Sequence, residues 1–217
     1  MATSSIRISP YRKPCVPALT DTHNDYVPPL DYSFKGVSTF PEVMEEEPRP
    51  RNTSIPKSPS KTIESKDKSA MKSDTRSIRL NNNSLENWSG ITDTVISLLT
   101  NPNTLGWLDV SFNHLTTIDK AILDYPSLTV LYLHGNDIAD MKQTDNLSTL
   151  QKLRTLTLHG NPIENQFGYR PYTLGRCPNL KNFDFSGVTK SDWATSKTWN
   201  ILYKAKEKKK KPIELVP

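Results

Sequence analysis

The chain has 217 residues, a formal net charge of +5 and a mean hydropathy of −0.59. No stretch approaches the ~20 apolar residues that a membrane-spanning helix needs, and the N-terminus lacks the apolar run of a secretory signal. The two cysteines, Cys15 and Cys177, are too few for a disulfide framework. We therefore expect one domain with tails, in a reducing compartment and not in a membrane.

Residues 1–75 are expected to form an extended or disordered arm. The segment holds ten of the 17 prolines and few clustered aliphatic residues, so it buries too little apolar surface to offset the entropy of ordering. One aromatic and aliphatic island, residues 28–34, is predicted to be a linear motif that docks on a partner. The alternative is that it folds back over the open edge of the domain that follows. The motif residues are Pro29, Leu30, Asp31, Tyr32 and Phe34.

An internal repeat dominates residues 76–189. The pattern L-x-x-L-x-L-x-x-N-x-L recurs three times, and the first leucines of successive copies, from Leu105 to Leu180, are 23, 25 and 27 residues apart. Degenerate copies precede and follow, so about five repeats are expected. The three close copies are Leu105-Gly-Trp-Leu108-Asp-Val110-Ser-Phe-Asn113-His-Leu115, Leu128-Thr-Val-Leu131-Tyr-Leu133-His-Gly-Asn136-Asp-Ile138 and Leu153-Arg-Thr-Leu156-Thr-Leu158-His-Gly-Asn161-Pro-Ile163.

The repeat predicts an α/β solenoid with a parallel, concave sheet and a helical convex side. In each copy, residues such as Leu131 and Leu133 alternate inward on a short strand, while Tyr132 and His134 face outward. No repeat covers its own apolar face, so neighbours must stack. The repeated asparagine is predicted to satisfy backbone groups at the turn. Helical segments are expected at Ile91–Leu99, 118–125, 141–150, 164–177 and about 191–206.

The outward residues of the strands form the predicted binding surface. Trp107 and Tyr132 among polar neighbours have the composition of a protein-binding hot spot; the alternative is that Trp107 merely covers the first strands. His134 and His159 occupy the same position in adjacent repeats, where we expect a stacked pair and neither a metal nor a cofactor site, because no further ligands flank them. The candidate residues are Arg79, Trp107, Asp109, Val130, Tyr132, His134, Thr157, His159 and Asp184.

A terminal helix and a lysine-rich tail are expected over residues 190–217. Residues 191–217 hold seven lysines against three acidic residues, a net charge of +4, whereas residues 76–190 are neutral. Such a run is attracted to acidic surfaces, and salt weakens that attraction. A solubilising extension and a nuclear-localisation signal are the alternatives. The residues concerned are Lys204, Lys206, Lys208, Lys209, Lys210 and Lys211.

No motif for catalysis is present. The chain lacks a phosphate-binding G-x-x-x-x-G-K-[ST] loop, a G-x-S-x-G elbow, a C-x-x-C pair and an H-E-x-x-H helix. Asp109 and Asp184 fall on strands too far apart to act as a carboxylate pair. We therefore expect no enzymatic activity and no small-molecule substrate.

The repeats resemble the short leucine-rich-repeat subclass typified by phosphatase regulatory solenoids, and residues 169–184 resemble its C-terminal cap. Less generic strings resemble the leucine-rich repeat-containing protein 51 family, over about residues 28–199. The resemblance implies a structural protein of the cytoplasm and cytoskeleton, in a ciliary or flagellar axoneme, that binds tubulin or other proteins of doublet microtubules. A phosphatase-regulatory or adaptor solenoid is the alternative, followed by a nuclear, RNA-associated protein, although nucleic acid is not expected because the repeats are neutral. The strings are Pro29-Leu-Asp-Tyr-Ser-Phe34, Leu80-Asn-Asn-Asn83, Val130-Leu-Tyr-Leu-His-Gly-Asn136, Leu156-Thr-Leu-His-Gly-Asn-Pro162 and Phe183-Asp-Phe-Ser-Gly-Val-Thr-Lys190.

Overall fold

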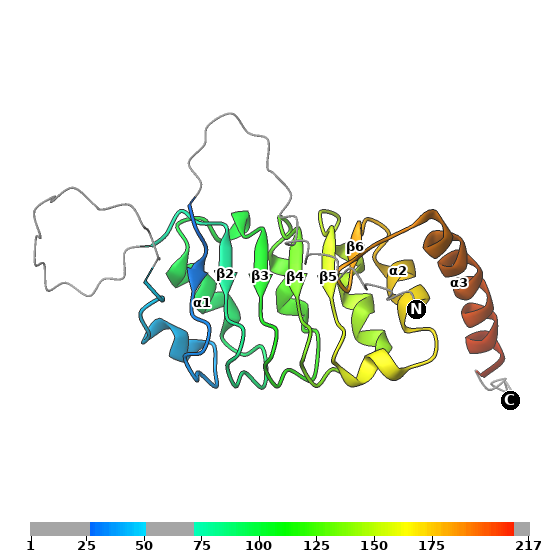
Figure 1. Cartoon of the computed structure of the whole chain (residues 1–217), viewed down its shortest axis with the longest axis horizontal. Helices are drawn as coiled ribbons and strands as arrows, with labels where there is room; N and C mark the ends of the chain where they lie inside the picture. The colour runs from blue at the N-terminus through cyan, green and yellow to red at the C-terminus, as the bar shows by residue number, and fades with distance from the viewer. Residues whose placement is uncertain (1–26, 51–71, 211–217) are drawn as a thin grey trace, which may run out of the picture.

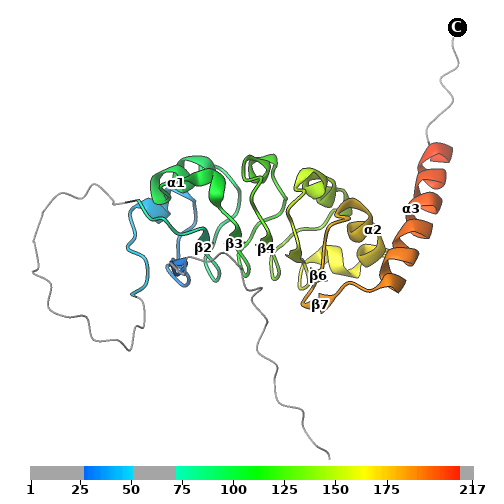
Figure 2. The same cartoon turned by 90° about the horizontal axis from the view of Figure 1, so that it is seen from above.

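The computed structural model describes residues 27–50 and 72–210, with the backbone alone for residues 204–210. These residues form an elongated stack of coils, with short strands side by side on one face and helical segments on the other (Figures 1 and 2). The predicted disorder of residues 1–26 and 51–71, and Lys211 of the predicted cation run, lie outside the described residues.

A seven-stranded sheet runs along the stack, and its strands follow one another in chain order. All neighbouring strands are parallel except the last pair. The register brings Leu108, Leu131 and Leu156 side by side, and all three are fully buried. The predicted α/β solenoid with a parallel sheet is therefore confirmed. The strands are β1 (Leu30–Asp31), β2 (Ser77–Arg79), β3 (Trp107–Asp109), β4 (Val130–Tyr132), β5 (Thr155–Thr157), β6 (Asn182–Phe183) and β7 (Ser186–Gly187).

The helical side consists of short segments, most of them 3-10 helices. The helix predicted at Ile91–Leu99 is confirmed, as are the short segments near residues 118–125 and 141–150. The single helix predicted over residues 164–177 is wrong, because Gly168, with φ of 88°, interrupts it. The segments are η1 (Pro41–Met44), α1 (Ile91–Leu98), η2 (Pro102–Thr104), η3 (Lys120–Asp124), η4 (Met141–Thr149), η5 (Pro162–Asn165), α2 (Tyr169–Arg176) and α3 (Lys190–Lys210).

An asparagine ladder joins the coils, as the repeat predicts. The side-chain amide of Asn136 donates to the carbonyl oxygens of Val110 and Leu133, and its oxygen accepts from the backbone N–H of Leu115. Asn113 and Asn161 make the equivalent bonds one coil earlier and one coil later. Each asparagine thus satisfies buried backbone groups of two adjacent coils at once.

The N-terminal motif differs from the prediction, because residues 27–50 belong to the solenoid. Strand β1 pairs in parallel with β2, and the Asn83 side chain bonds to the backbone of residues 32, 35, 36 and 37. Phe40 is fully buried and stacks on Trp88, with ring centroids 5.9 Å apart. The folded unit therefore does not begin at residue 76. The motif covers the open edge, which was the alternative to an external partner.

The C-terminal end closes differently. After β6 the chain reverses at Asp184 and Phe185, which have φ of 50° and 58°, and β7 returns antiparallel to β6. Helix α3 then packs against α2 and ends the stack (Figure 1). The final helix is thus longer than predicted, since it extends to Lys210.

Candidate protein-binding surface

Aromatic side chains gather over the centre of the sheet, on its solvent-facing side. The Tyr132 ring contacts those of Trp107 and Phe185, with centroids 6.0 and 5.6 Å away. Phe185 also contacts the His134 and His159 rings, at 5.5 and 5.4 Å. Trp107 and Tyr132 are half-buried, and Phe185 is 56 % exposed. We call this group the concave aromatic patch; its members are Trp107, Tyr132, His134, His159 and Phe185.

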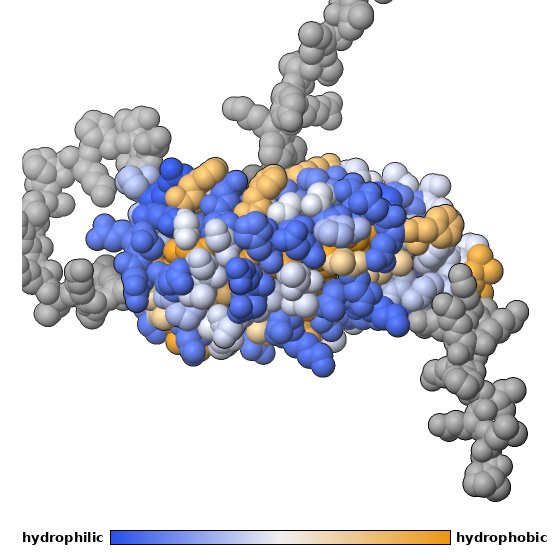
Figure 3. Space-filling model, turned by 90° about the horizontal axis from the view of Figure 1, so that it is seen from below, coloured by the Kyte–Doolittle hydropathy of each residue, from blue (hydrophilic) through white to orange (hydrophobic). Residues whose placement is uncertain are grey.

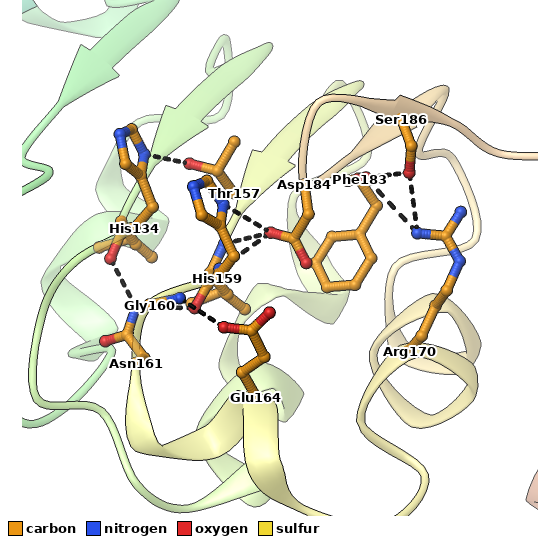
Figure 4. Close-up of polar contacts among 12 residues, drawn as sticks. His134, Thr157, His159, Gly160, Asn161, Glu164, Arg170, Phe183, Asp184 and Ser186 are labelled. Carbon is orange, nitrogen blue, oxygen red and sulfur yellow. Dashed lines mark hydrogen bonds and ion pairs between the residues drawn. The ribbon is translucent and has the colours of Figure 1, made fainter.

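The two histidines stack as predicted from their equivalent positions. Their ring centroids are 4.7 Å apart and the rings are nearly parallel, at 8°. The His134 Nδ1 atom lies 2.8 Å from the Thr157 hydroxyl (Figure 4). Burial, with a contribution from His159, lowers the pKa of His134 to about 4, although Asp184 opposes the shift. His134 is therefore neutral at pH 7 and serves as an aromatic and hydrogen-bonding group.

Asp184 does not sit where the repeat predicts. The prediction that Asp184 faces outward from a strand is wrong, since β6 ends at Phe183 and the carboxylate turns back toward the end of β5. Its Oδ1 atom accepts from the backbone N–H groups of Leu158 and His159, at 2.7 and 3.0 Å, and its Oδ2 atom accepts from the Tyr169 hydroxyl at 2.8 Å. Figure 4 shows Asp184 pointing at the His159 segment. The carboxylate thus anchors the hairpin that carries Phe185.

Charged residues flank the patch on the N-terminal side. The Arg79 guanidinium lies 5.2 Å from the Trp107 ring centroid, and its Nη1 atom is 3.4 Å from Asp31 Oδ2. Asp109 is 8 % exposed and accepts from the N–H and the hydroxyl of Ser111. Burial raises the pKa of Asp109, and the bonds from Ser111 partly counteract that rise. The Arg79 cation, the Trp107 ring and the carboxylates of Asp31 and Asp109 thus lie close together beside the patch.

Not every predicted residue is accessible. Thr157 is fully buried, so it supports the His134 ring and cannot reach a partner. Tyr32 is 3 % exposed, which is inconsistent with a freely docking motif, whereas Phe34 is 65 % exposed. Val130, at the side of the patch, is half-buried. Pro29 and Leu30 of the N-terminal motif are half-buried as well. Five of the predicted cations lie in the last part of α3, where the backbone alone is described: Lys204, Lys206, Lys208, Lys209 and Lys210.

Two features of the structure were not predicted from the sequence: the exposure of Phe185 and the additional N-terminal coil. The repeat register puts Phe185 at the inward position that Leu133 and Leu158 occupy, and nothing local indicates the chain reversal that exposes it. The N-terminal coil did leave a signal, because Leu30-Asp-Tyr-Ser-Phe34 matches Leu108-Asp-Val-Ser-Phe112. Phe34 and Phe112 even share a positive φ, at 58° and 54°. Comparison of these two strings indicates an additional coil.

The described residues offer little for other chemistry. In residues 27–50 and 72–210, no group of three or more His, Cys, Asp or Glu side chains is arranged to hold a metal ion. Cys177 is buried, which raises the pKa of its thiol to about 12, so it is protonated at neutral pH. Within the same part of the chain, no helix has the length and apolar character needed to span a bilayer.

Fold and surface together define the class of protein. The family model described as "Leucine-rich repeat" matches residues 75–213. A crystal structure of the Drosophila melanogaster SNF/U2A′ complex contains a chain with the same fold, with a TM-score of 0.50 and 22 % identity. That match covers 58 % of this chain and 73 % of the other. The molecule is a leucine-rich-repeat protein, a class of protein-binding repeat proteins.

Sequence relatives narrow the class. Leucine-rich repeat-containing protein 51 of Rattus norvegicus is 45 % identical over 175 residues, which cover 81 % of this chain and 86 % of the relative. The Homo sapiens protein of that name is 42 % identical over the same shares. A Caenorhabditis elegans protein named "Probable U2 small nuclear ribonucleoprotein A′" is 29 % identical over 55 % of this chain and 48 % of its own length. The chain belongs to the leucine-rich repeat-containing protein 51 family.

Proposed function

We propose that this protein is a non-catalytic structural component of the ciliary or flagellar axoneme. It binds tubulin or a protein associated with doublet microtubules through the concave aromatic patch. The main support for this binding surface is the position of Phe185. Its ring is 56 % exposed, and the hairpin holds it over Tyr132 and the histidine pair. A large apolar ring fixed in solvent is stabilised when a partner covers it.

The chemistry of the patch favours a protein partner. Protein interfaces usually have aromatic residues and arginine at their centre and polar, hydrogen-bonding side chains at their margin, and the patch has this composition. Arg79 is already engaged with Asp31 and Trp107, so little free positive charge faces outward there. The asparagine ladder and the buried leucines hold the patch rigidly, which lowers the entropy lost on binding.

The axonemal setting is supported by the resemblance to the protein 51 family and by the cation run at the end of α3. Lysines on this helix and in the tail would be drawn to acidic surfaces such as glutamate-rich tubulin tails, with a strength that falls as salt is added. In this proposal the patch supplies specificity and the lysines supply long-range attraction. The protein would then reside in the cytoplasm, bound to the cytoskeleton of the cilium.

Co-sedimentation with microtubules tests the binding step. Phe185→Ala should weaken binding about tenfold or more, as expected for a hot-spot aromatic residue. Ile96→Ala is the matched control, because Ile96 is 46 % exposed on α1, on the opposite side of the molecule. A tagged copy in a ciliated cell should localise along the axoneme. Equal microtubule binding by the two variants would contradict the proposal, and so would exclusion of the tagged copy from cilia.

An RNA-associated role is the second candidate, and the observation in its favour is the relative named as a U2 ribonucleoprotein protein. Against it, the cation of the concave face is paired with Asp31, and the lysines lie at the far end. RNA binding through the lysines alone would show a steep dependence on salt and no sequence preference. Sequence-specific RNA binding that is lost in Phe185→Ala would favour this candidate instead.

A further inference from the structure

Helix α3 presents two different faces. One face packs against α2: the Ser196 hydroxyl donates to the Pro171 carbonyl oxygen at 2.7 Å, and the Tyr203 ring lies 5.2 Å from that of Tyr172. The contact is close, since a Cβ added to Gly175 would lie 1.8 Å from an atom of Asn200. Positions 193, 196, 200 and 203 follow helical spacing and account for this buried side.

The other face is exposed and partly apolar. Ile201 and Leu202 are 70 % and 63 % exposed. A shallow groove of about 380 Å³ runs along the helix and is lined by Ala194, Thr195, Thr198, Trp199 and Leu202. Phe167, which is 87 % exposed, places its ring 5.0 Å from Trp199. Figure 3 shows hydrophobic surface at this end of the molecule, beside predominantly hydrophilic coils.

A surface helix packed on one side normally carries polar residues on the other. Here the exposed side chains of Ile201, Leu202 and Phe167 lie at or near a groove that is lined by α3 alone. Contiguous apolar surface of this kind marks a site of interaction. The groove lies on a different element from the concave aromatic patch, although the lysines beside it are those to which the function proposed above assigns long-range attraction.

The positive charge beside the groove indicates which kind of ligand fits it. Beyond Leu202 the helical backbone is described to Lys210, and its sequence there is Lys204-Ala-Lys-Glu-Lys-Lys-Lys210. Positions 206 and 209 follow Leu202 by four and seven residues, which places them on the groove side of the helix. Lys197 on α3 is also exposed. An apolar groove that runs into a cation-rich segment is complementary to a ligand that is apolar along one stripe and acidic beside it.

We propose that the exposed face of α3 binds an acidic amphipathic helix of a partner protein. The partner helix places aliphatic residues at i, i+4 and i+7 over Leu202, Trp199 and Phe167, and its carboxylates meet the lysines. A second copy of this chain is the less favourable occupant, because its own lysine run would be placed beside an identical one. A membrane is less favourable as well, since the apolar residues line a groove.

Fluorescence anisotropy with the full chain tests this proposal. The probe is a synthetic 18-residue helical peptide with leucines at i, i+4 and i+7 and glutamates on its flanks; a second peptide has lysine in place of each glutamate. We expect the acidic peptide to bind and the lysine peptide to bind at least tenfold more weakly. Leu202→Asp, and separately Lys206→Gln combined with Lys209→Gln, should each weaken binding of the acidic peptide at least tenfold.

Matched controls show whether the loss of binding belongs to this face of α3. Ile96→Asp places the same change on an exposed position of α1 and should leave binding unchanged, as should Phe185→Ala in the concave aromatic patch. Circular dichroism checks that Leu202→Asp is folded, and Phe167→Ala gives a second, milder variant. The proposal is overturned by equal binding of both peptides, by unchanged binding in Leu202→Asp, by a wild-type dimer that Leu202→Asp dissolves, or by phosphatidylcholine–phosphatidylserine vesicles that displace the peptide.

Discussion

The two ends of the solenoid are closed in opposite ways. At the N-terminal end an additional coil imitates the repeats: β1 extends the sheet in parallel, and the N–H of Arg49 donates to the carbonyl oxygen of Asp31 at the outer edge. At the C-terminal end the chain reverses into the β6–β7 hairpin and then into α3. Both devices protect an open sheet edge and a bare core.

The difference lies in what each closure leaves exposed. The N-terminal coil buries its aromatic residues Tyr32 and Phe40 and leaves Phe34 exposed beside Arg49, whereas the C-terminal closure leaves Phe185, Phe167 and the outer side of α3 exposed. Closure by imitation repeats the burial pattern of the coils. Closure by reversal breaks that pattern: it adds Phe185 to the concave aromatic patch, whose other members lie on regular coils, and it leaves the outer side of α3 exposed.

The largest expected effect breaks the N-terminal closure. Phe40→Ala should lower the free energy of unfolding by about 4 kcal/mol, because a fully buried aromatic ring is lost from the core. Phe34→Ala is the control and should change it by less than about 0.5 kcal/mol, because the ring is exposed. Urea unfolding curves measure both. Similar small effects would mean that residues 27–50 are not part of the cooperative unit.

The second effect compares a glycine at each end. Gly168→Ala should cost about 3 kcal/mol, because φ is 88° and the new Cβ would lie 1.9 Å from the Trp199 ring. Gly36→Ala should cost about 1 kcal/mol, because φ is 72° but nothing lies within 4 Å of the new Cβ. Thermal unfolding together with Trp fluorescence distinguishes them. A cost for Gly168→Ala no larger than that for Gly36→Ala would contradict the close packing of α3.

The third effect concerns the anchor of the C-terminal hairpin. Asp184→Ala should cost about 2 kcal/mol, because two backbone N–H groups and the Tyr169 hydroxyl lose their acceptor. Asp137→Ala is the control, since that side chain is 57 % exposed. Urea unfolding measures the loss, and microtubule binding should fall with it because Phe185 is no longer held. An unaffected hairpin, seen as unchanged amide exchange at residues 182–187, would argue against this role.

The smallest effect is a pH dependence from the histidine pair. The pKa of His134 is about 4 in the folded chain, below its ordinary 6.5, so between these values the unfolded chain binds a proton that the folded chain does not. The free energy of unfolding should therefore fall as the pH drops from 6.5 to 4, by on the order of 2 kcal/mol, and not further below.

The measurement is the difference in unfolding free energy between wild type and His134→Gln across that pH range. His114→Gln, at a side chain that is 62 % exposed, is the matched control. A difference between wild type and His134→Gln that stays constant from pH 6.5 to pH 4 would contradict the burial of this ring.

Local spacing was sufficient for the regular coils. Leu131, Leu133 and Asn136 recur at fixed offsets because each coil must present the same inward side chains and the same turn amide to its neighbours. The sheet, its register, the buried leucines, the asparagine ladder and the stacked histidines could therefore be read from the sequence. The closure at residues 27–50 was also encoded, in the match between the strings ending at Phe34 and Phe112, but its low aliphatic content concealed it.

Only the tertiary structure decided that Phe185 completes the concave aromatic patch and that one side of α3 remains exposed. Phe183-Asp-Phe185 has the same inward–outward alternation as the earlier repeats, and the reversal at Asp184 depends on hydrogen-bond donors from Leu158, His159 and Tyr169, which are distant in sequence. Which side of α3 remains exposed depends likewise on the position of α2. Repetition specifies a coil wherever a neighbour follows. Where no neighbour follows, the end of the chain is shaped by contacts that no local pattern records.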